Sequence, residues 1–542
     1  MRHREDYRFS QVPSVSIPRS MFSRSRMHKT TFNPNVLVPI FVDEVLPGDT
    51  YKTRMSVFAR LSTPIVPLMD NLYLDFFFFF VPNRLVWDNW QQFMGEQPDP
   101  AVPPVARTVP QVVAGGGGFG ALSIFDYFGI PPTVASLSVN ALYARAYNLI
   151  WNEWFRDENL CSPAPVVKGD GPDPVGNYIL RKRGKRHDYF TSCLPWPQKG
   201  PGVTLPLAGL ADVKTVTTGK VTGAQTGLTF KTVGGATPTP TILGMSTAGL
   251  TTASATGGAV GGGTLWYPDN LKADFSSVQA VTINTMRQAF QVQRLLERDA
   301  RGGTRYTELL RAHFGVVSPD ARLQRPEYLG GGTMPVVINP VAQSTQTGAT
   351  GTPMGSLAAF GHASGSHVGF TKSFVEHGVL IGLVMARADL TYQQGVERKF
   401  SRQTRYDYFW PALAHLGEQA VLNKEIYATG VGDPVAGTGD YGAFGYQERY
   451  AEYRYAPSMI TGQFRSTGTL ANFDIWHLAQ WFAALPNLNQ SFIEEAVPLD
   501  RCLALPSNGP LATPNFIFDS WFDVRCARPM PVYGVPGLID HF

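Results

Sequence analysis

The side chains best suited to chemistry in this sequence are the cations near its N-terminus. Residues 1–35 carry seven Arg or Lys and two acids, a local charge of +5, whereas the whole 542-residue chain carries +4. The segment lacks hydrophobic periodicity, which is typical of an extended arm, and its cations could neutralise phosphates. The candidate nucleic-acid-binding residues are Arg2, Arg4, Arg8, Arg24, Arg26 and Lys29. Two alternatives stay open: a frayed terminus with incidental charge, and an arm that laces neighbouring copies together.

A second basic run, RKRGKRH at Arg181–His187, follows a turn region rich in Gly and Pro. Five positive side chains at this spacing can contact phosphates and release counterions on binding. Such a run is also typical of a solvated loop. Both interpretations stay open.

The sequence contains no catalytic constellation that we can identify. GGGGFG at Gly115–Gly120 matches the dinucleotide-binding spacing, but Pro-rich sequence precedes it where that site requires a strand, so we predict a flexible turn. His362 and His367 are five residues apart on a Gly/Ser-rich stretch, whereas helical metal ligands are four apart. Glu494 and Glu495 flank no recognisable partner. We therefore predict a protein that is not an enzyme and that uses no cofactor or metal ion.

Composition predicts a large core and extensive contact with other protein. Aromatic residues make up 12% of the chain and charged residues 16%, which excludes global disorder and favours surfaces depleted in charge. The longest apolar stretches, Phe76–Val81 and Gly378–Ala386, are far shorter than the ~20 residues of a membrane span. We expect no secretory signal and no membrane insertion. Four cysteines outside any CxxC pair predict reduced thiols: Cys161, Cys193, Cys502 and Cys526.

Strand patterns are scattered along the chain and separated by long insertions. In residues 55–61 apolar and polar residues alternate, which predicts one buried and one exposed face. The run Leu72–Val81 is apolar on both faces apart from Asp75 and suits a central strand of a sandwich. Further predicted strands are Val379–Ala386, Lys399–Phe409, Glu448–Ala456 and Phe516–Arg525. Predicted helices lie in the insertions: Val139–Phe155, Ser276–Arg298 and Arg305–Phe314, the last with Thr304 as N-cap and Gly315 after its end.

This pattern favours an antiparallel sandwich with large loops over a doubly wound parallel sheet, because regular helices do not alternate with the strands. Residues 201–264 differ in kind: they hold 16 Thr, 14 Gly and only four charged side chains. Such a segment cannot bury a core of its own size. It is either a flexible linker or β-rich decoration that is stabilised by packing against copies of itself.

Long phrases of this chain resemble one known family. They are TTFNPN (Thr30–Asn35), VDEVLPGD (Val42–Asp49), VPNRLVW (Val81–Trp87), LLERDARGGTRYTELLRAHFGV (Leu295–Val316), RLQRPEYLGG (Arg322–Gly331), YFWPALAHLGEQAVLNKEIY (Tyr408–Tyr427), FGYQERYAEYRY (Phe444–Tyr455) and MPVYGVPGLIDHF (Met530–Phe542). The chain resembles the major capsid proteins of the Microviridae, small icosahedral single-stranded DNA bacteriophages, and is most similar to the gokushovirus branch. The likeness covers nearly the whole chain in order. Residues 201–264 match less closely, where that branch is expected to carry a variable insertion.

The resemblance implies a mainly β fold: one eight-stranded antiparallel jelly roll, residues 36–542, with long loop insertions and a basic arm at 1–35. It implies sixty copies in a T=1 shell with five-, three- and two-fold contacts, a location in the virion, and synthesis in the cytoplasm of the bacterial host. It also implies that 201–264 protrudes at the three-fold axis and takes part in host attachment. The implied partners are circular single-stranded DNA, a small basic DNA-binding protein, other virion or scaffolding proteins, and a host surface receptor.

A different class of function is compatible with the same composition. The aromatic content and the Thr/Gly-rich segment would also suit an adhesin or a carbohydrate-binding β-sandwich. Mass separates the two hypotheses, because a shell protein forms particles of megadalton size and an adhesin stays a monomer or small oligomer.

Overall fold

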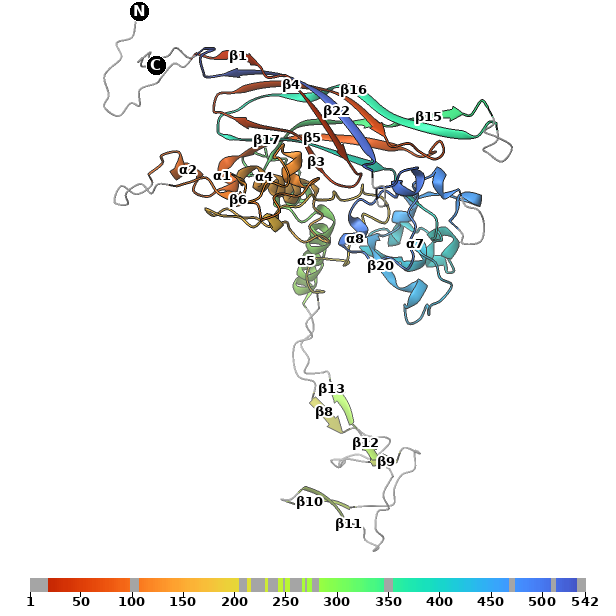
Figure 1. Cartoon of the computed structure of the whole chain (residues 1–542). Helices are drawn as coiled ribbons and strands as arrows, with labels where there is room; N and C mark the ends of the chain where they lie inside the picture. The colour runs from red at the N-terminus through yellow and green to blue at the C-terminus, as the bar shows by residue number, and fades with distance from the viewer. Residues whose placement is uncertain are drawn as a thin grey trace, which may run out of the picture. The chain divides into compact units, whose positions relative to one another are not determined.

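The computed structural model describes residues 18–97, 107–203, 282–345, 354–466, 473–507 and 513–533, together with six short strands between residues 212 and 274. The chain divides into two compact units. The first contains Met1–Lys199 and Glu297–Phe542, and the second contains Gly200–Leu296. Figure 1 shows the two large sheets of the first unit as layers.

The larger sheet has six strands, and all of its pairings are antiparallel. Its strands are β1 (Ser20–Ser23), β2 (Arg26–Phe32), β22 (Phe516–Arg528), β4 (Thr50–Leu61), β16 (Leu357–Ser373) and β15 (Val337–Ala342). β1 and β2 pair one after the other along β22, so they act as one interrupted strand. β22 then pairs with β4, β4 with β16, and β16 with β15.

The second large sheet has four antiparallel strands in the order β14-β5-β17-β3. They are β14 (Glu327–Pro335), β5 (Leu72–Pro82), β17 (Gly378–Ala388) and β3 (Val38–Val45). Most connections between successive large strands cross from one sheet to the other, whereas β5 to β14 and β15 to β16 stay within a sheet. With β2-β22-β4-β16 facing β3-β17-β5-β14, this is the strand order of a jelly roll.

The core between the two sheets is built from the inward side chains of both. Phe41 on β3 meets Phe522 on β22 with ring centroids 5.0 Å apart. Phe78 on β5 meets Phe370 on β16 at 5.4 Å. Aromatic pairs at such distances contribute beyond their buried area, which explains why the sandwich uses so many phenylalanines.

Three strands of the four-stranded sheet, β3, β5 and β17, are largely buried on both faces, whereas β14 at its edge is partly exposed. The other face of this sheet packs against an insertion that contains α1 (Asn83–Val86), α3 (Ile124–Tyr127), α4 (Leu142–Ile150) and the π-helical turn η1 (Trp151–Phe155). Figure 1 shows α1 and α4 against this sheet. Phe77 on β5 contacts Phe155 at 5.1 Å, edge to face. This second packing layer is the reason why β5 is apolar on both sides, as the sequence predicted.

The remaining described elements of the first unit lie in its insertions. They are α2 (Trp90–Phe93), β6 (Gln111–Val113) paired with β7 (Ser138–Asn140), and α6 (Tyr306–Phe314). Between β17 and β22 the chain forms a lobe, residues 389–502, around an apolar cluster that it shares with Tyr189, Phe190 and Cys193. This C-terminal lobe contains β18 (Thr391–Tyr392), β19 (Glu418–Leu422), α7 (Asn423–Ile426), β20 (Ala443–Glu448), β21 (Ser458–Met459) and α8 (Gln490–Ile493).

The second unit contains three antiparallel strand pairs that are nested in sequence. They are β8 (Asp212–Thr215) with β13 (Leu271–Asp274), β9 (Phe230–Thr232) with β12 (Trp266–Pro268), and β10 (Ile242–Ser246) with β11 (Gly249–Ala253). Helix α5 (Ile283–Gly302) spans the boundary between the units. Most of the predicted insertion, 201–264, lies outside the described residues, so its proposed role stays a prediction.

The predicted antiparallel sandwich with helical insertions is confirmed. The strands predicted at 55–61, 72–81, 379–386 and 516–525 lie within β4, β5, β17 and β22. α6 ends as expected at Gly315, whose φ of 69° is left-handed. Its N-cap is Arg305 rather than Thr304, whose hydroxyl donates instead to Asn159. All four cysteines are free and buried.

Two predicted strands are wrong. Residues 399–409 form 3-10 turns, η4 (Arg398–Ser401) and η5 (Arg405–Asp407), and residues after Glu448 form a turn with η8 (Ala451–Tyr453). Side chains of the two segments contact one another instead, with the Arg402 guanidinium 4.3 Å from the Tyr453 ring centroid. Tyr450, with φ 65°, adopts a left-handed conformation that no strand residue takes.

Candidate functional site

The predicted nucleic-acid-binding residues fall into three groups. Arg2, Arg4 and Arg8 lie outside the described residues. Arg24 and Arg26 contact protein groups: Arg24 pairs with Asp43 at 2.8 Å, and Arg26 donates to the Val42 carbonyl at 2.6 Å. Lys29 on β2 is exposed. The described contacts of Arg24 and Arg26 join the edge of one sheet to the other, and Lys29 is left available for a ligand.

Lys29 belongs to a larger set of cations on the exposed face of the six-stranded sheet. We call this face the sheet surface. Burial alternates strictly along β4, and alternate residues of β22 are also exposed. The outward cations are Lys29, Lys52, Arg54, Arg60 and Arg525. Sequence reasoning missed all but the first, although the polar positions of the period-two pattern contained the signal.

None of these five cations forms an ion pair with a described carboxylate. The ion pairs that the same strands do form use other residues: Arg24 with Asp43, Lys372 with Glu327, and Arg528 with Asp49. Two acids, Asp519 and Asp523, face outward on β22, so the surface keeps a positive excess. Unpaired cations on a flat face are available to phosphates.

Aromatic rings lie among these cations. Phe58 is 54% exposed, Trp521 47% and Phe360 42%. His362 stacks on Phe360 with centroids 6.0 Å apart, and it lies opposite Arg60 in the strand register. Exposed rings between cations can stack unpaired bases while the cations contact phosphates. The sheet surface therefore has the chemistry of a platform for single-stranded nucleic acid.

The basic run at 181–187 is mostly turned inward. The Arg181 guanidinium lies 5.4 Å from the Trp151 ring centroid, and burial lowers the pKa of Arg181. Arg183 pairs with Asp75 at 3.1 Å. Lys185 donates to a main-chain carbonyl at 2.7 Å, and burial lowers its pKa. These cations anchor the insertion to the sandwich, and the exposed members of the run include Arg186 and His187.

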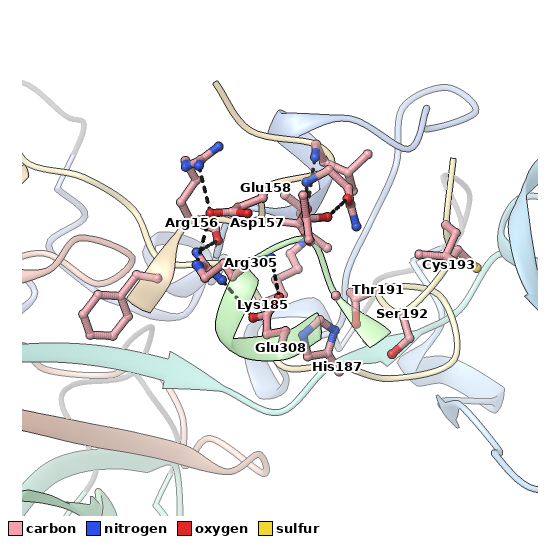
Figure 2. Close-up of a pocket in the computed structure, with 18 of the residues that line it drawn as sticks. Arg156, Asp157, Glu158, Lys185, His187, Thr191, Ser192, Cys193, Arg305 and Glu308 are labelled. Atoms are coloured by element: carbon pink, nitrogen blue, oxygen red, sulfur yellow. Dashed lines mark hydrogen bonds and ion pairs between the residues drawn. The ribbon is translucent and has the colours of Figure 1, made fainter. Parts of the chain in front are cut away.

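The same run lines a cavity of about 630 Å³ between the sandwich insertion and the start of α6. Its other cations are matched by carboxylates, as Figure 2 shows. Glu158 accepts from Arg156 at 3.1 Å and lies 3.2 Å from Arg305. Arg305 also pairs with Glu308 at 3.2 Å. Because these charges compensate one another, the arrangement fits a structural ion-pair cluster better than an anion site.

The cavity does not contain an activated nucleophile among its described residues. Burial raises the pKa of the Cys193 thiol, which disfavours the reactive thiolate. In the searched, described part of the chain, no group of three or more His, Cys, Asp or Glu could hold a metal ion. The run GGGGFG forms turns, with Gly118 at φ 75°, as predicted.

Asp75, the one charged residue of the predicted apolar strand, lies in one buried network with Glu495, for which the sequence identified no partner. Asp75 accepts from Arg387 at 2.7 Å and pairs with Arg183. Glu495 lies near Lys185, Arg183 and Arg387, yet burial raises its pKa to about 7. Buried charges of this kind require partners from distant segments. The network therefore joins β5, β17 and the basic run.

Among the described residues, no helix is long and apolar enough to cross a membrane. A jelly-roll sandwich is one of the architectures that viral capsid proteins use. Comparison with known proteins agrees. The family described as "Capsid protein (F protein)" matches residues 10–538.

Three curated relatives match along nearly their whole length. The chain is 49% identical over 545 residues to capsid protein VP1 of Bdellovibrio phage phiMH2K, covering 100% of this chain and 99% of that protein. It is 45% identical over 594 residues to capsid protein VP1 of Chlamydia phage 1 (98% and 97% covered) and 37% identical over 546 residues to that of Spiroplasma virus 4 (98% and 97%). The chain belongs to the Microviridae capsid family, in its gokushovirus branch. It is a structural component of the virion and not an enzyme, and the adhesin alternative is set aside.

Proposed function

We propose that sixty copies of this chain form a closed T=1 shell around a circular single-stranded DNA genome. The observation that carries the DNA part of this proposal is the sheet surface, where five cations without described carboxylate partners surround exposed rings. Membership of the capsid family supports the shell. Repetition by symmetry lets interfaces of modest strength add up over the particle.

The basic arm supplies a second DNA contact in this proposal. Sixty arms at +5 each would neutralise on the order of a tenth of a genome of a few thousand nucleotides. The cations of the sheet surface raise the neutralised fraction, but most of the charge of the genome stays uncompensated. A separate small basic protein therefore remains a partner in our proposal, together with other virion or scaffolding proteins.

The mass of purified particles tests the shell. Sixty chains of 59.4 kDa correspond to about 3.6 MDa of protein, before the genome is added. Native mass measurement on nuclease-treated empty particles should give that value. A stable monomer in the presence of its assembly partners, or a shell with a different number of copies, would contradict the proposal.

Removal of charge tests the DNA contact. We would replace Lys52, Arg54 and Arg60 together by Gln and measure the DNA retained per particle as salt is raised. We expect release at lower salt, because each lost phosphate contact lowers the affinity for DNA, and a flatter dependence of binding on salt. The matched control replaces three exposed cations elsewhere, and should behave as wild type: Lys182, Arg311 and Arg322. Equal retention in both variants would mean that the sheet surface does not face the genome.

The arm requires its own test, because Arg24 and Arg26 already contact protein groups. Replacing Arg2, Arg4 and Arg8 by Gln should lower DNA retention without changing the stability of the subunit. If the variant instead fails to assemble while its unassembled subunits still bind DNA normally, the arm connects neighbouring subunits and does not bind DNA.

We also propose that residues 201–264 meet two symmetry copies at the three-fold axis and contact a host receptor. Four charged side chains in 64 residues leave little repulsion between three such segments. A trimer could share a burial that one segment cannot provide alone. Replacing residues 203–263 by a short Gly/Ser linker should give shells that form but attach poorly to the host. Failure of the subunit to fold would place this segment in the core instead.

A further inference from the structure

A second surface rich in aromatic and basic residues lies on the C-terminal lobe. We call residues 398–416 with 448–455 the Tyr–Arg surface. Its large exposed side chains are between 43% and 75% exposed: Phe400, Tyr406, Tyr408, Phe409, Trp410, Leu416, Tyr453 and Tyr455. Exposed apolar groups gathered on one region of a soluble subunit mark an interaction site.

The surface is held rigid by contacts between its two segments. The Arg402 guanidinium lies 5.3 Å from the Tyr408 ring centroid and 4.3 Å from that of Tyr453. Phe409 packs edge to face on Tyr450 at 5.2 Å, and the Tyr450 hydroxyl donates to the Tyr408 carbonyl at 3.0 Å. Rings fixed in this way lose little conformational entropy when a partner binds.

The cations of this surface are largely neutralised from within. Glu452 lies 3.5 Å from Arg402 and 3.8 Å from Arg398. Arg398 also pairs with Glu425 at 3.0 Å. Two further pairs join Lys399 to Glu397 and Arg454 to Glu448.

The two remaining cations lie over rings, Arg405 over Trp410 at 5.1 Å and Arg449 over Tyr450 at 4.8 Å. The surface therefore offers rings and few free charges.

This charge balance decides the kind of partner. A polyanion gains most from cations that release counterions, and here most cations are already paired. Tyr, Trp and Arg around a neutralised centre are instead the composition of a protein–protein contact. Capsid proteins contact copies of themselves in a shell. A second copy of this chain is therefore the partner that fits this composition. We propose that the Tyr–Arg surface is a contact between copies of this chain in the shell. This inference rests on the proposed assembly.

Footprinting of assembled and unassembled protein tests it directly. Hydroxyl-radical labelling of Tyr406, Tyr408 and Tyr455 should fall several-fold in particles relative to unassembled subunits, and should stay low in empty particles that hold no DNA. Equal labelling in particles and subunits would overturn the inference. Protection that disappears in empty particles would also overturn it, because DNA would then be the partner. Particle mass is measured separately, so failure of the shell proposal is distinguishable.

A pair of substitutions tests the energetic role. Phe400→Ser with Tyr406→Ser removes two rings that are 75% and 61% exposed, so the folded subunit should keep its melting temperature. Particle yield should fall by about tenfold or more, because aromatic anchors dominate interface energetics.

The matched control, Val375→Ser with Val435→Ser, removes side chains that are 87% and 95% exposed outside both surfaces. It should assemble normally. Normal yield of the Tyr–Arg variant, or equal loss in the control, would contradict the inference.

Discussion

The sheet surface and the Tyr–Arg surface are built from the same kinds of residue but differ in how their charges are compensated. On the sheet surface the cations stand on alternate positions of flat strands, where no described carboxylate pairs with them. On the Tyr–Arg surface two irregular segments bring glutamates against most of the arginines. Composition alone would assign both surfaces to the same ligand. Pairing separates them into a platform for a polyanion and a neutral face for protein.

The difference follows from backbone geometry. A strand places every second side chain outward at fixed spacing. Asp519 and Asp523 stand opposite Lys29 and Arg54 in the register without forming an ion pair, and the other three cations have no acid opposite them.

A lobe of turns has no such period, so long side chains can converge from several segments on one carboxylate. Glu452 receives Arg398, Arg402 and the amide of Gln419 in this way. Irregular structure thus provides the charge compensation that a flat sheet face lacks.

The largest loss of stability should come from removing Glu452, the carboxylate that these side chains share. Glu452→Gln removes a carboxylate with a side chain only 9% exposed and leaves Arg402, 11% exposed, without its charge partner. We expect a loss of about 3 kcal/mol in the free energy of unfolding, because an uncompensated buried charge is costly. Urea unfolding followed by tryptophan fluorescence measures it.

Lys372→Gln, which removes a cation whose side chain is 46% exposed and pairs with Glu327, is the control and should cost less than about 1 kcal/mol. Equal losses would mean that burial of the pair does not matter.

Removing one aromatic ring should weaken DNA binding on the sheet surface but not on the Tyr–Arg surface. Trp521→Ala on the sheet surface should weaken binding of unassembled subunits to a labelled oligothymidine by about 1–3 kcal/mol, because one base loses its stacking platform. Tyr406→Ala on the Tyr–Arg surface should leave the affinity unchanged. Fluorescence anisotropy gives both affinities under the same salt. A larger loss with Tyr406→Ala would reverse our assignment of the two surfaces.

The salt dependence of DNA binding should also differ between the two surfaces when single cations are removed. Each of Lys52→Gln and Arg60→Gln should lower the slope of log affinity against log salt by about 0.7 if the lost cation contacts one phosphate of a single strand. Arg405→Gln, a cation held over the rings of the Tyr–Arg surface, should not change the slope. Unchanged slopes for the sheet-surface variants would remove these cations from the DNA contact.

The smallest effect should be a pH dependence of the C-terminal lobe. Burial raises the pKa of Glu425 above its ordinary value, although Arg398 opposes the shift. The folded lobe therefore binds a proton that the unfolded chain has already released, so the contribution of this group to stability falls as pH rises through its folded pKa. The stability of wild type relative to Glu425→Gln should accordingly improve as the pH is lowered. Thermal melts at a series of pH values measure it, and the opposite slope would contradict the raised pKa.

Much of the sandwich could be read from the sequence. The alternation in residues 55–61 identified β4 together with its exposed face, and the apolar run at 72–81 identified β5 as a strand covered on both sides. The covering layer on one of those sides is helical, and no local pattern specified that. The family resemblance, which rests on long phrases spread over the chain, agrees with the comparisons.

The sites were harder to predict than the fold. The N-terminal cations drew attention because they are dense in sequence, yet Arg24 pairs across the sandwich with Asp43. The sheet-surface cations were overlooked because Lys52, Arg60 and Arg525 are far apart or diluted by apolar neighbours in sequence. They become one surface only when β22 pairs with β4. Density in sequence and density in space are different quantities in a sheet protein.

By itself, the sequence determined where four strands of the sandwich lie, β4, β5, β17 and β22, because the period of buried side chains is a local property of the chain. It also determined the family. Only the tertiary structure decided which cations are free. The strands predicted at 399–409 and 448–456 were wrong because both segments form 3-10 turns, in which Arg402 of one segment lies over Tyr453 of the other. Charge compensation depends on which groups the fold brings within a few ångströms, and Coulomb interactions at that range are set by spatial neighbours rather than by order along the chain.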